Sequence, residues 1–511
     1  MNPKLTRRDF VKSVTAGAAS IGVLQFLPSS SPGADEGAEL YHEKYRPQFH
    51  FTPKMNWMND PNGLVYYKGE YHMFFQHNPF GINWGNMTWG HAVSKDLVHW
   101  EQLANAIEPD ELGTIFSGSA VVDWKNTSGL QTGDENVLVA LYTAAGEFAK
   151  PEKKKFTQCL AYSNDRGRTW VKYHGNPIVG NIRDDDRDPK VIWHEPTKKW
   201  VMVLFLDKDD EFAILISPNL INWEISQILT LEGSRECPDL FPMEIAGNPG
   251  SEKWIFRGGN GRYRIGRFDG REFTPESEVL DSVTGNYYAV QTWSDIPEHD
   301  GRTLQIAWMR DGEFPGMVFN QQMTIPCELT LRTLPEGMRL CHKPVREIKN
   351  IRKRLFEFKN AALEQGGNPL KEITGKLFEI EAEIEIGTAK EITFMLRGTP
   401  MVYSCPDKTL TCRSRKISLS PIDGKLKFHI LVDRTSIEIF PNEGNMCIFL
   451  SFPLDTENES LGVHSGGGQA KATDLKVWTL KSIWLKTSRS VADLSNDGIV
   501  NFLDFAMLTG L

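Results

Sequence analysis

Short apolar runs alternate with turn-forming Gly, Asn, Asp and Pro residues from about Tyr41 to Pro344. Such runs, rich in β-branched and aromatic side chains, indicate β-strands, whereas helical periodicity is hard to find. Five strongly apolar runs stand out, and their starts lie roughly 50 to 66 residues apart, which is the spacing of propeller blades. They begin at Tyr71 (YHMFFQ), Val137 (VLVALYT), Trp200 (WVMVLFL), Trp254 (WIFRGG) and Leu304 (LQIAWM).

A weak internal repeat accompanies these runs: a strand that ends in Ser, a turn that contains Asp or Asn, and then a Trp. Copies occur as HAVSKDLVHWE (91–101), LAYSNDRGRTWVK (160–172) and ILISPNLINWE (214–224), with a degraded copy in IGRFDGREF (265–273). The repeat predicts an all-β fold with a five-bladed β-propeller over residues 41–345. A β-sandwich or jelly roll would also supply many short strands, but it gives no reason for the repeat.

The pattern changes to strict alternation in LFEIEAEIEI (377–386) and in FHILVDRTSIEIF (428–440), which we interpret as a hairpin that turns at Asp433-Arg434. Alternation indicates sheets with one buried and one solvent-exposed face, so residues 346–485 are predicted to form a C-terminal β-sandwich. It carries no cluster of candidate catalytic residues. We expect it to support the propeller or to contact carbohydrate.

One further strand must come first in each blade and line the propeller axis. The candidates are residues 59–67, 116–123, 187–194, 237–244 and 287–293. Because inner strands run the same way along the axis, their starts meet at one mouth of the channel. The residues at these starts are Asp60, Ser117, Asp188, Glu236 and Tyr288.

Three carboxylates at one mouth repel one another, so function explains them better than stability does. Taken singly, Asp60 in NDPNG and Asp188 before Pro189 also fit turn positions. Glu236 is harder to explain in that way, since Glu is a poor turn former. Three independent turns that all place acids at one mouth are improbable.

Paired carboxylates without a metal motif favour the cleavage of a glycosidic bond, by one protonated and one ionised group. We assign the acid/base to Glu236, because apolar flanks such as Cys237 would raise its pKa. Asp60, beside Asn59 and Asn62, is expected to stay ionised as the nucleophile. Asp188, beside Arg187, suits hydrogen bonds to substrate hydroxyls. The chain has no H-E-x-x-H and no G-x-S-x-G motif, which argues against metalloproteases and serine hydrolases.

The composition fits this chemistry. A net charge of -9 and a pI near 5.8 argue against nucleic acid or an anionic membrane as the partner. The 14 Trp and 28 Phe residues suit both core packing and contact with sugars. The seven cysteines form no metal-type pair, so we expect mostly buried thiols, with a Cys405–Cys412 bridge as the alternative.

Six ordered motifs resemble glycoside hydrolase family 32, which contains invertases, inulinases and levanases. They are WMNDPNG (57–63), FQHNP (75–79), the segment from Trp84 to His91, FSGS (116–119), RDP (187–189) and ECPDLF (236–241). The resemblance covers about residues 45–480 and looks most like the levanase group. It implies retention of configuration, with Asp60 as nucleophile, Glu236 as acid/base and Asp188 as transition-state stabiliser. It also implies substrate contacts from Asn59, Gln76, Trp84, Phe116, Ser117, Arg187 and Trp308, to which the inner-strand argument adds Tyr288.

Two departures from the family pattern fall on the fifth blade. Gly285-Asn286-Tyr287-Tyr288 stands where relatives usually carry Arg-Asp-Phe-Tyr, and Pro326-Cys327-Glu328-Leu329 replaces Pro-Arg-Glu-Leu. Both are expected to lie near the sugar on the leaving side, so sucrose, inulin and levan remain alternative substrates. The function indicated is a fructan hydrolase without a catalytic cofactor. The alternatives are a fructan-binding protein and a fructosyltransferase on the same scaffold.

The chain ends carry separate signals. Arg7-Arg8 and the apolar run from Val14 to Leu27 predict a twin-arginine export signal and linker over residues 1–40, too short for a stable membrane span, with a periplasmic, cell-surface or extracellular destination. The tail, residues 486–511, resembles half of a dockerin module and implies a calcium loop and a cohesin-like partner. The calcium ligands would be Asp493, Ser495, Asp497, Ile499, Asn501 and Asp504.

Overall fold

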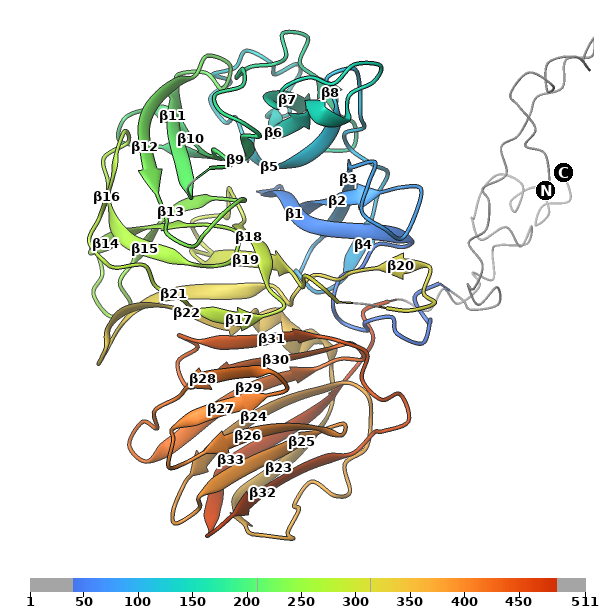
Figure 1. Cartoon of the computed structure of the whole chain (residues 1–511), viewed down its shortest axis with the longest axis vertical. Coiled ribbons are helices and arrows are strands. Elements are labelled where there is room, and N and C mark those ends of the chain that lie inside the picture. The colour runs from blue at the N-terminus through green and yellow to red at the C-terminus, as the bar shows by residue number, and fades with distance from the viewer. Residues whose placement is uncertain (1–39, 209, 313, 485–511) are drawn as a thin grey trace, which may run out of the picture.

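The computed structural model describes residues 40–208, 210–312 and 314–484. In these ranges the secondary structure consists of β-strands and two short 3-10 helices. A propeller lies above a sandwich in Figure 1, and the two are joined by the short 3-10 helix η2 (Arg346–Ile351). A second 3-10 turn, η1 (Gly146–Phe148), follows a propeller strand. In these ranges no helix is long and apolar enough to cross a membrane. The predicted export signal and calcium loop lie outside the described residues.

Five separate sheets, each with four sequential strands, form the propeller, as the sequence repeat predicted. The alternative prediction of a β-sandwich or jelly roll over this region is therefore wrong. Blades 1 and 2 contain β1 (Asn56–Tyr67), β2 (Glu70–Asn78), β3 (Thr88–Ser94) and β4 (Trp100–Gln102), then β5 (Thr114–Val122), β6 (Leu138–Ala145), β7 (Thr157–Ser163) and β8 (Val171–Lys172). Blades 3 and 4 contain β9 (Arg187–His194), β10 (Lys199–Phe205), β11 (Glu211–Ser217) and β12 (Glu224–Thr230), then β13 (Asp239–Glu244), β14 (Glu252–Arg257), β15 (Tyr263–Phe268) and β16 (Phe273–Pro275). Blade 5 contains β18 (Tyr288–Thr292), β19 (Thr303–Trp308), β21 (Cys327–Leu334) and β22 (Gly337–Pro344), and β20 (Phe319–Asn320) joins the first blade.

The repeated Ser, Asp or Asn, and Trp form the outer turn of a blade. In the first copy, Ser94 Oγ and Asp96 Oδ1 accept backbone N–H groups of the turn, and Trp100 Nε1 donates to the carbonyl of Leu97 at 3.2 Å. The second and third copies repeat these bonds through Ser163, Asp165 and Trp170, and through Ser217, Asn219 and Trp223. The motif is thus explained by local capping of one turn.

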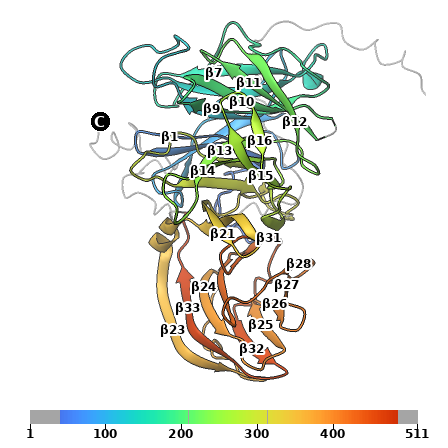
Figure 2. The same ribbon diagram turned by 90° about the vertical axis from the view of Figure 1, so that its left-hand side faces the viewer.

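The sandwich packs two sheets against each other, antiparallel except for the β17–β31 pair, and Figure 2 shows them as two layers. One layer has the order β17-β31-β30-β29-β24-β33-β23 and the other β28-β27-β26-β25-β32. Alternating apolar residues fill the space between them. The strands are β17 (Val283–Gly285), β23 (Arg352–Leu363), β24 (Phe378–Glu385), β25 (Glu391–Leu396), β26 (Thr399–Ser404), β27 (Thr409–Cys412), β28 (Arg415–Ser418), β29 (Lys425–Val432), β30 (Ser436–Pro441), β31 (Cys447–Ser451), β32 (Leu461–Gly466) and β33 (Ala470–Leu480).

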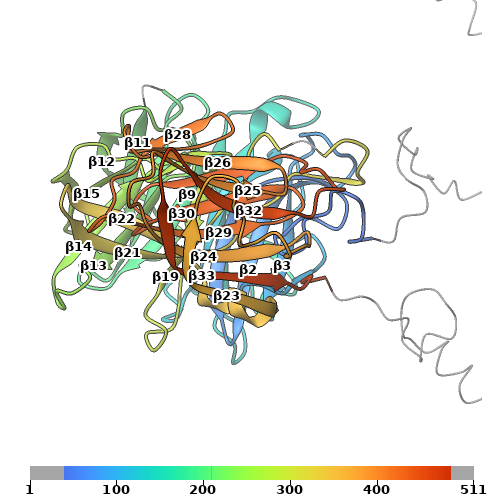
Figure 3. The same ribbon diagram turned by 90° about the horizontal axis from the view of Figure 1, so that it is seen from below.

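Apolar clusters lie between neighbouring blades, and the cluster of blades 1 and 5 continues into the sandwich through Leu431, Phe440, Phe449 and Trp478. From the sandwich end, strands β23, β25 and β32 lie in front of the propeller (Figure 3). The predicted hairpin at Asp433-Arg434 is present between β29 and β30. All seven cysteines are free and six are buried, which excludes a Cys405–Cys412 bridge in this structure.

A buried charged group also joins the domains. His50 Nδ1 lies 2.8 Å from Asp433 Oδ2, and its Nε2 lies 3.4 Å from Glu438 Oε1. The Asp433 carboxylate also accepts the backbone N–H groups of Gln48 and Phe49. The start of the propeller is therefore fixed to the β29–β30 turn by polar contacts that no water reaches.

We expect this group to make stability depend on pH. Burial lowers the pKa of His50, but the carboxylates of Glu438 and Asp433 outweigh burial and raise it to about 9. An unfolded His has a pKa of about 6.5, so the imidazolium stabilises the fold fully below about pH 6.5, and this contribution is lost as pH rises through about 9. In urea titrations, His50→Gln should therefore destabilise the protein more near pH 6 than above pH 9. A difference that does not change with pH would contradict this account.

Candidate active site

The inner strands are irregular where the predicted site residues lie. The pairing of β1 with β2 shifts between Met58 and Pro61, and similar shifts interrupt β5, β9 and β18. Asp188 and Glu236 have φ of 65° and 56°, in the left-handed region that side chains usually avoid. Bulges re-aim side chains, and backbone strain of this kind gathers at functional sites. Proline after Asp60, Asp188 and Cys237 promotes these interruptions, because it removes a ladder donor.

Asp60 lines a pocket at the axial mouth. Its Oδ2 accepts a hydrogen bond from Ser117 Oγ at 2.6 Å, and its Oδ1 accepts one from Asn59 Nδ2 at 3.0 Å. Burial, and to a smaller degree the charge of Glu236, raises the pKa of Asp60 although these donors lower it. The sequence-based expectation that its neighbours would keep Asp60 ionised omitted this burial. Asn62 does not touch Asp60; in its satisfied orientation it contacts Gln76 and Ser117.

Asp188 is buried, with 3% of its surface exposed. Its Oδ2 accepts the backbone N–H of Cys237 at 3.0 Å, and the Cys237 Sγ lies 3.5 Å from both Asp188 Oδ2 and Asp60 Oδ2. The thiol thus separates two carboxylates. Burial raises the pKa of Asp188 to about 7, helped by the charges of Glu236 and Asp60 and opposed by Arg187.

Glu236 has a polar environment. Arg187 Nη2 donates to its Oε1 at 3.0 Å, and the Tyr288 hydroxyl donates to its Oε2 at 2.5 Å. Arg187 is itself held by Asp207 at 2.8 Å. The predicted apolar flanks do not enclose the carboxylate, because the neighbouring Cys237 packs against Asp60 and Asp188 instead. The Glu236 side chain is 32% exposed, so it can exchange protons with water.

The structure brings all predicted catalytic and substrate-binding residues into one pocket of about 270 Å³. Trp84 and Phe116 form an aromatic side, with ring centroids 6.0 Å apart. Trp308 also lines the pocket, and its Nε1 donates to Gln321 Oε1. The predicted residues that line the pocket are Asn59, Asp60, Gln76, Trp84, Phe116, Ser117, Arg187, Asp188, Glu236, Tyr288 and Trp308.

One pocket residue, Arg310, was missed by the sequence reasoning. It lines the pocket two residues after Trp308, and its guanidinium carbon lies 4.7 Å from the Tyr288 ring centroid. Arg310 lies in the turn that follows β19, so its nearness to Trp308 in the sequence was the available signal.

Asp188→Asn is expected to stabilise the protein above neutral pH. The pKa of Asp188, about 7, exceeds the value near 3.9 of an unfolded Asp. Its stabilising contribution is therefore fully present below about pH 4 and is lost as pH rises through about 7. The Tm of the variant relative to the wild type should increase by a few degrees between pH 4 and pH 8 in calorimetry. A Tm difference that is constant or falls with pH would be inconsistent with a buried, repelled carboxylate.

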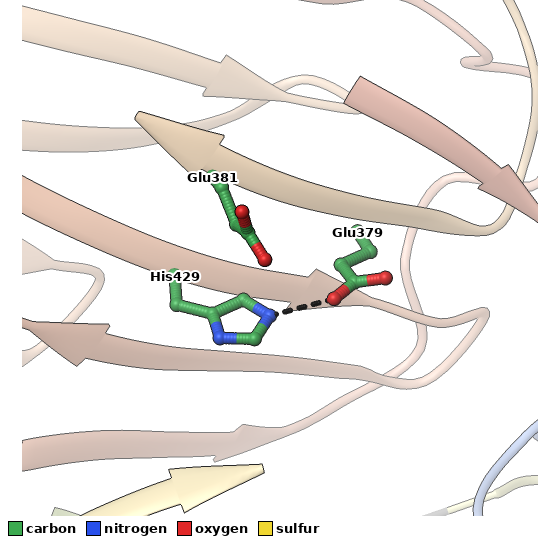
Figure 4. A group of neighbouring side chains, drawn as sticks. All are labelled: Glu379, Glu381 and His429. Carbon is green, nitrogen blue, oxygen red and sulfur yellow. Dashed lines mark hydrogen bonds and ion pairs between the residues drawn. The ribbon is translucent and has the colours of Figure 1, made fainter. Parts of the chain in front are cut away.

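A candidate metal cluster lies elsewhere, in the sandwich. Among the described residues, one group of His, Cys, Asp or Glu side chains has ligand atoms within 4.8 Å of one another: Glu379, Glu381 and His429 (Figure 4). Arg352 already occupies this cluster, with Nη2 2.7 Å from Glu379 and 3.1 Å from Glu381. Because the guanidinium neutralises these carboxylates, we interpret the cluster as an ion-pair network rather than a metal site.

A propeller with converging carboxylates at one axial mouth defines a glycoside hydrolase of the carboxylate-pair class. Comparison with known proteins gives the family. The profile "Glycosyl hydrolases family 32 N-terminal domain" matches residues 50–344, and "Glycosyl hydrolases family 32 C terminal" matches residues 347–479. The chain therefore belongs to glycosyl hydrolase family 32.

Individual relatives agree with this assignment. The chain is 42% identical to a levanase of Bacillus subtilis (strain 168), across 90% of this chain and 74% of the relative. It is 30% identical to an extracellular exo-inulinase of Aspergillus ficuum, across 87% of this chain and 96% of the relative. The crystal structure of an exo-inulinase from Aspergillus awamori superposes with a TM-score of 0.78 at 28% identity, covering 87% of this chain and all of that one. These matches confirm the predicted five-bladed propeller and sandwich, and they identify the chain as a fructan hydrolase.

Proposed function

We propose that this fructan hydrolase is an exo-acting, retaining β-fructosidase that releases fructose from levan or inulin, with sucrose as a further substrate. The observation that carries the proposal is the placement of Asp60 and Glu236 in one small pocket. At about 270 Å³, the pocket suits a single terminal sugar rather than a long internal segment. The levanase and exo-inulinase relatives support the substrate class.

The assigned roles follow from the contacts of each carboxyl group. Asp60 attacks the anomeric carbon and forms a covalent fructosyl ester, while Glu236 donates its proton to the departing oxygen. Glu236 then removes a proton from water, which attacks the ester and releases fructose with its original configuration. The partial exposure of Glu236 suits this exchange. No cofactor takes part in either step.

Asp188 and the remaining pocket residues bind the sugar. The buried Asp188 carboxyl and the donors Asn59, Ser117 and Arg187 are suited to hydrogen bonds with fructosyl hydroxyls. Trp84 and Phe116 offer apolar faces to the C–H side of the sugar. Such contacts tighten as the ring flattens towards an oxocarbenium-like state, which assigns Asp188 to the stabilisation of that state.

Product analysis tests this proposal. Purified full-length protein is incubated with levan, inulin and sucrose, and the early products are separated by anion-exchange chromatography. Fructose as the only early product is expected from the fructans. Oligosaccharides as early products would show endo action, transfer products that persist at low substrate concentration would show a fructosyltransferase, and binding without turnover would show a fructan-binding protein.

The two chain ends extend the proposal beyond the pocket. We propose export, which the extracellular exo-inulinase relative supports, by the twin-arginine route that Arg7-Arg8 indicates. We also propose calcium binding by residues 493–504 with docking to a cohesin-like partner. Calorimetric titration with calcium should give about one site in the full chain and none in a chain that ends at Lys486. Equal calcium uptake by both would overturn the calcium loop.

A further inference from the structure

Strand β17 belongs to the propeller in sequence but to the sandwich in space. It pairs in parallel with β31, with Val283 opposite Cys447 and Gly285 opposite Phe449, and the two strands lie side by side in Figure 1. Gly285 has φ of 110°, and a Cβ there would lie 1.9 Å from the carbonyl oxygen of Phe449. The backbone at Gly285 therefore packs closely against the edge of the sandwich sheet. The inner strand β18 begins only three residues later.

Asn286 links this edge to the wall of the pocket. Its backbone N–H donates to the Phe449 carbonyl at 2.7 Å, and its Oδ1 accepts the backbone N–H of Ser451 at 3.0 Å. Its Nδ2 donates to the backbone carbonyl of Arg310 at 2.6 Å. One amide side chain thus holds both the sandwich strand β31 and the backbone of a pocket residue. Asn286 is also one of the positions where this chain departs from the family pattern.

Arg310 lies on the same side of the pocket as Glu236. Its guanidinium carbon lies 4.7 Å from the ring centroid of Tyr288 and 5.9 Å from that of Trp308. The hydroxyl of the same Tyr288 donates to Glu236. Because an acid/base must reach the departing oxygen, the sugar beyond the cleaved bond lies on the Glu236 side. Arg310 therefore borders the leaving sugar, whereas Asp60 and Ser117 border the sugar that becomes fructose.

In the described part of the chain, no close ion pair occupies the donors of Arg310. Within the described ranges, its ion-pair contact is with the adjacent Asp311 at 3.6 Å, which is beyond good hydrogen-bond length. The side chain is 47% exposed. Stacking on Tyr288 restrains the planar guanidinium, so its N–H groups could donate to a ligand with little loss of rotamer freedom.

We propose that Arg310 is a specificity-determining residue that binds the sugar on the leaving side, and that Asn286 is a positioning residue that holds Arg310 from the sandwich domain. The inference rests on the proposed β-fructosidase activity and adds a role for the sandwich. Selection of the leaving sugar then depends on the Asn286 side chain, which connects the two domains, as well as on the pocket residues of the propeller.

Two substrates separate this role from catalysis in general: methyl β-D-fructofuranoside, whose leaving group is too small to reach Arg310, and a linear fructan tetrasaccharide. Arg310→Ala should lower kcat/KM for the tetrasaccharide by about tenfold or more, mainly through KM, as expected for lost hydrogen bonds to a charged donor. The loss for the methyl fructoside should be at least fivefold smaller. Arg267→Ala removes an arginine that is 73% exposed on β15, and it is the matched control that should keep wild-type kinetics.

The positioning role is tested in a double-mutant cycle. Asn286→Ala should also lower kcat/KM more for the tetrasaccharide than for the methyl fructoside, but less than Arg310→Ala does. The double variant, with both changes, should have the same kcat/KM for the tetrasaccharide as Arg310→Ala alone. Thermal unfolding measured in parallel separates this pattern from a general loss of fold, which would lower the activity on both substrates equally. Equal losses on both substrates, or additive effects of the two changes, would overturn the inference. If the wild type cleaves neither substrate, the proposed function fails instead.

Discussion

Replacing Glu236 with Gln is expected to lower kcat on fructans and sucrose by about 10²- to 10⁴-fold, the range for a lost general acid/base. Gln keeps the shape of the side chain and can still accept from the Tyr288 hydroxyl, so the pocket should remain intact. Its amide N–H groups are not acidic enough to protonate the departing oxygen. The loss of kcat/KM, which reports only the first step, should therefore be much smaller for β-fructosyl fluoride, whose leaving group needs no proton. Steady-state kinetics on both kinds of substrate measure the difference.

The matched control is Glu244→Gln. Glu244 is exposed at the far end of the inner strand β13, away from the pocket, and its replacement should leave kcat unchanged. If Glu236→Gln keeps full activity on sucrose and fructans, Glu236 is not the acid/base. An equal loss of kcat/KM on the fluoride would point instead to a damaged pocket.

Asp60→Asn is expected to lower kcat by more than about 10⁴-fold on every substrate, including the fluoride, because no leaving group replaces a missing nucleophile. The amide oxygen can still accept from Asn59 Nδ2, and the amide N–H can donate to Ser117 Oγ once that hydroxyl turns, so fructose should still bind with an affinity within a few-fold of the wild type, as calorimetry would show. Substantial turnover by this variant would contradict the assignment of Asp60. Loss of fructose binding would indicate that the residue mainly shapes the pocket.

The Glu236→Gln variant provides a second test of the same residue. With β-fructosyl fluoride, the first step remains fast while the second, which needs a base, becomes slow, so the ester accumulates. Mass spectrometry of digested protein should place one fructosyl unit on the peptide that contains Asp60. A fructosyl unit on the peptide of Asp188 would reverse the two roles.

The sequence predicted the pocket well because propeller topology is simple. Once five inner strands are located, their starts must meet, whatever the loops between them do. The residues Asp60, Ser117, Asp188, Glu236 and Tyr288 therefore converge as expected. The recurring Ser, Asp and Trp also reported directly on one local turn, which is a short-range effect.

What the sequence did not predict depends on contacts between distant segments. The apolar residues next to Glu236 in the sequence predicted an apolar environment for its carboxylate. In the structure, Cys237 packs away from this carboxylate, and Arg187, 49 residues earlier, pairs with it. The pairing of His50 with Asp433 spans 383 residues. Strand β17 reads as part of the fifth blade and instead extends the sandwich sheet, because the partner that completes its hydrogen bonds is β31.

The stereochemistry of transfer to methanol tests the central claim most directly. The enzyme is supplied with sucrose or inulin in dilute methanol, and the methyl fructoside formed is identified by NMR, since this product does not change its anomeric form in water as fructose does. Double displacement through an ester on Asp60 predicts methyl β-D-fructofuranoside. Formation of methyl α-D-fructofuranoside would show a single displacement and would contradict the account of Asp60 as nucleophile and Glu236 as acid/base.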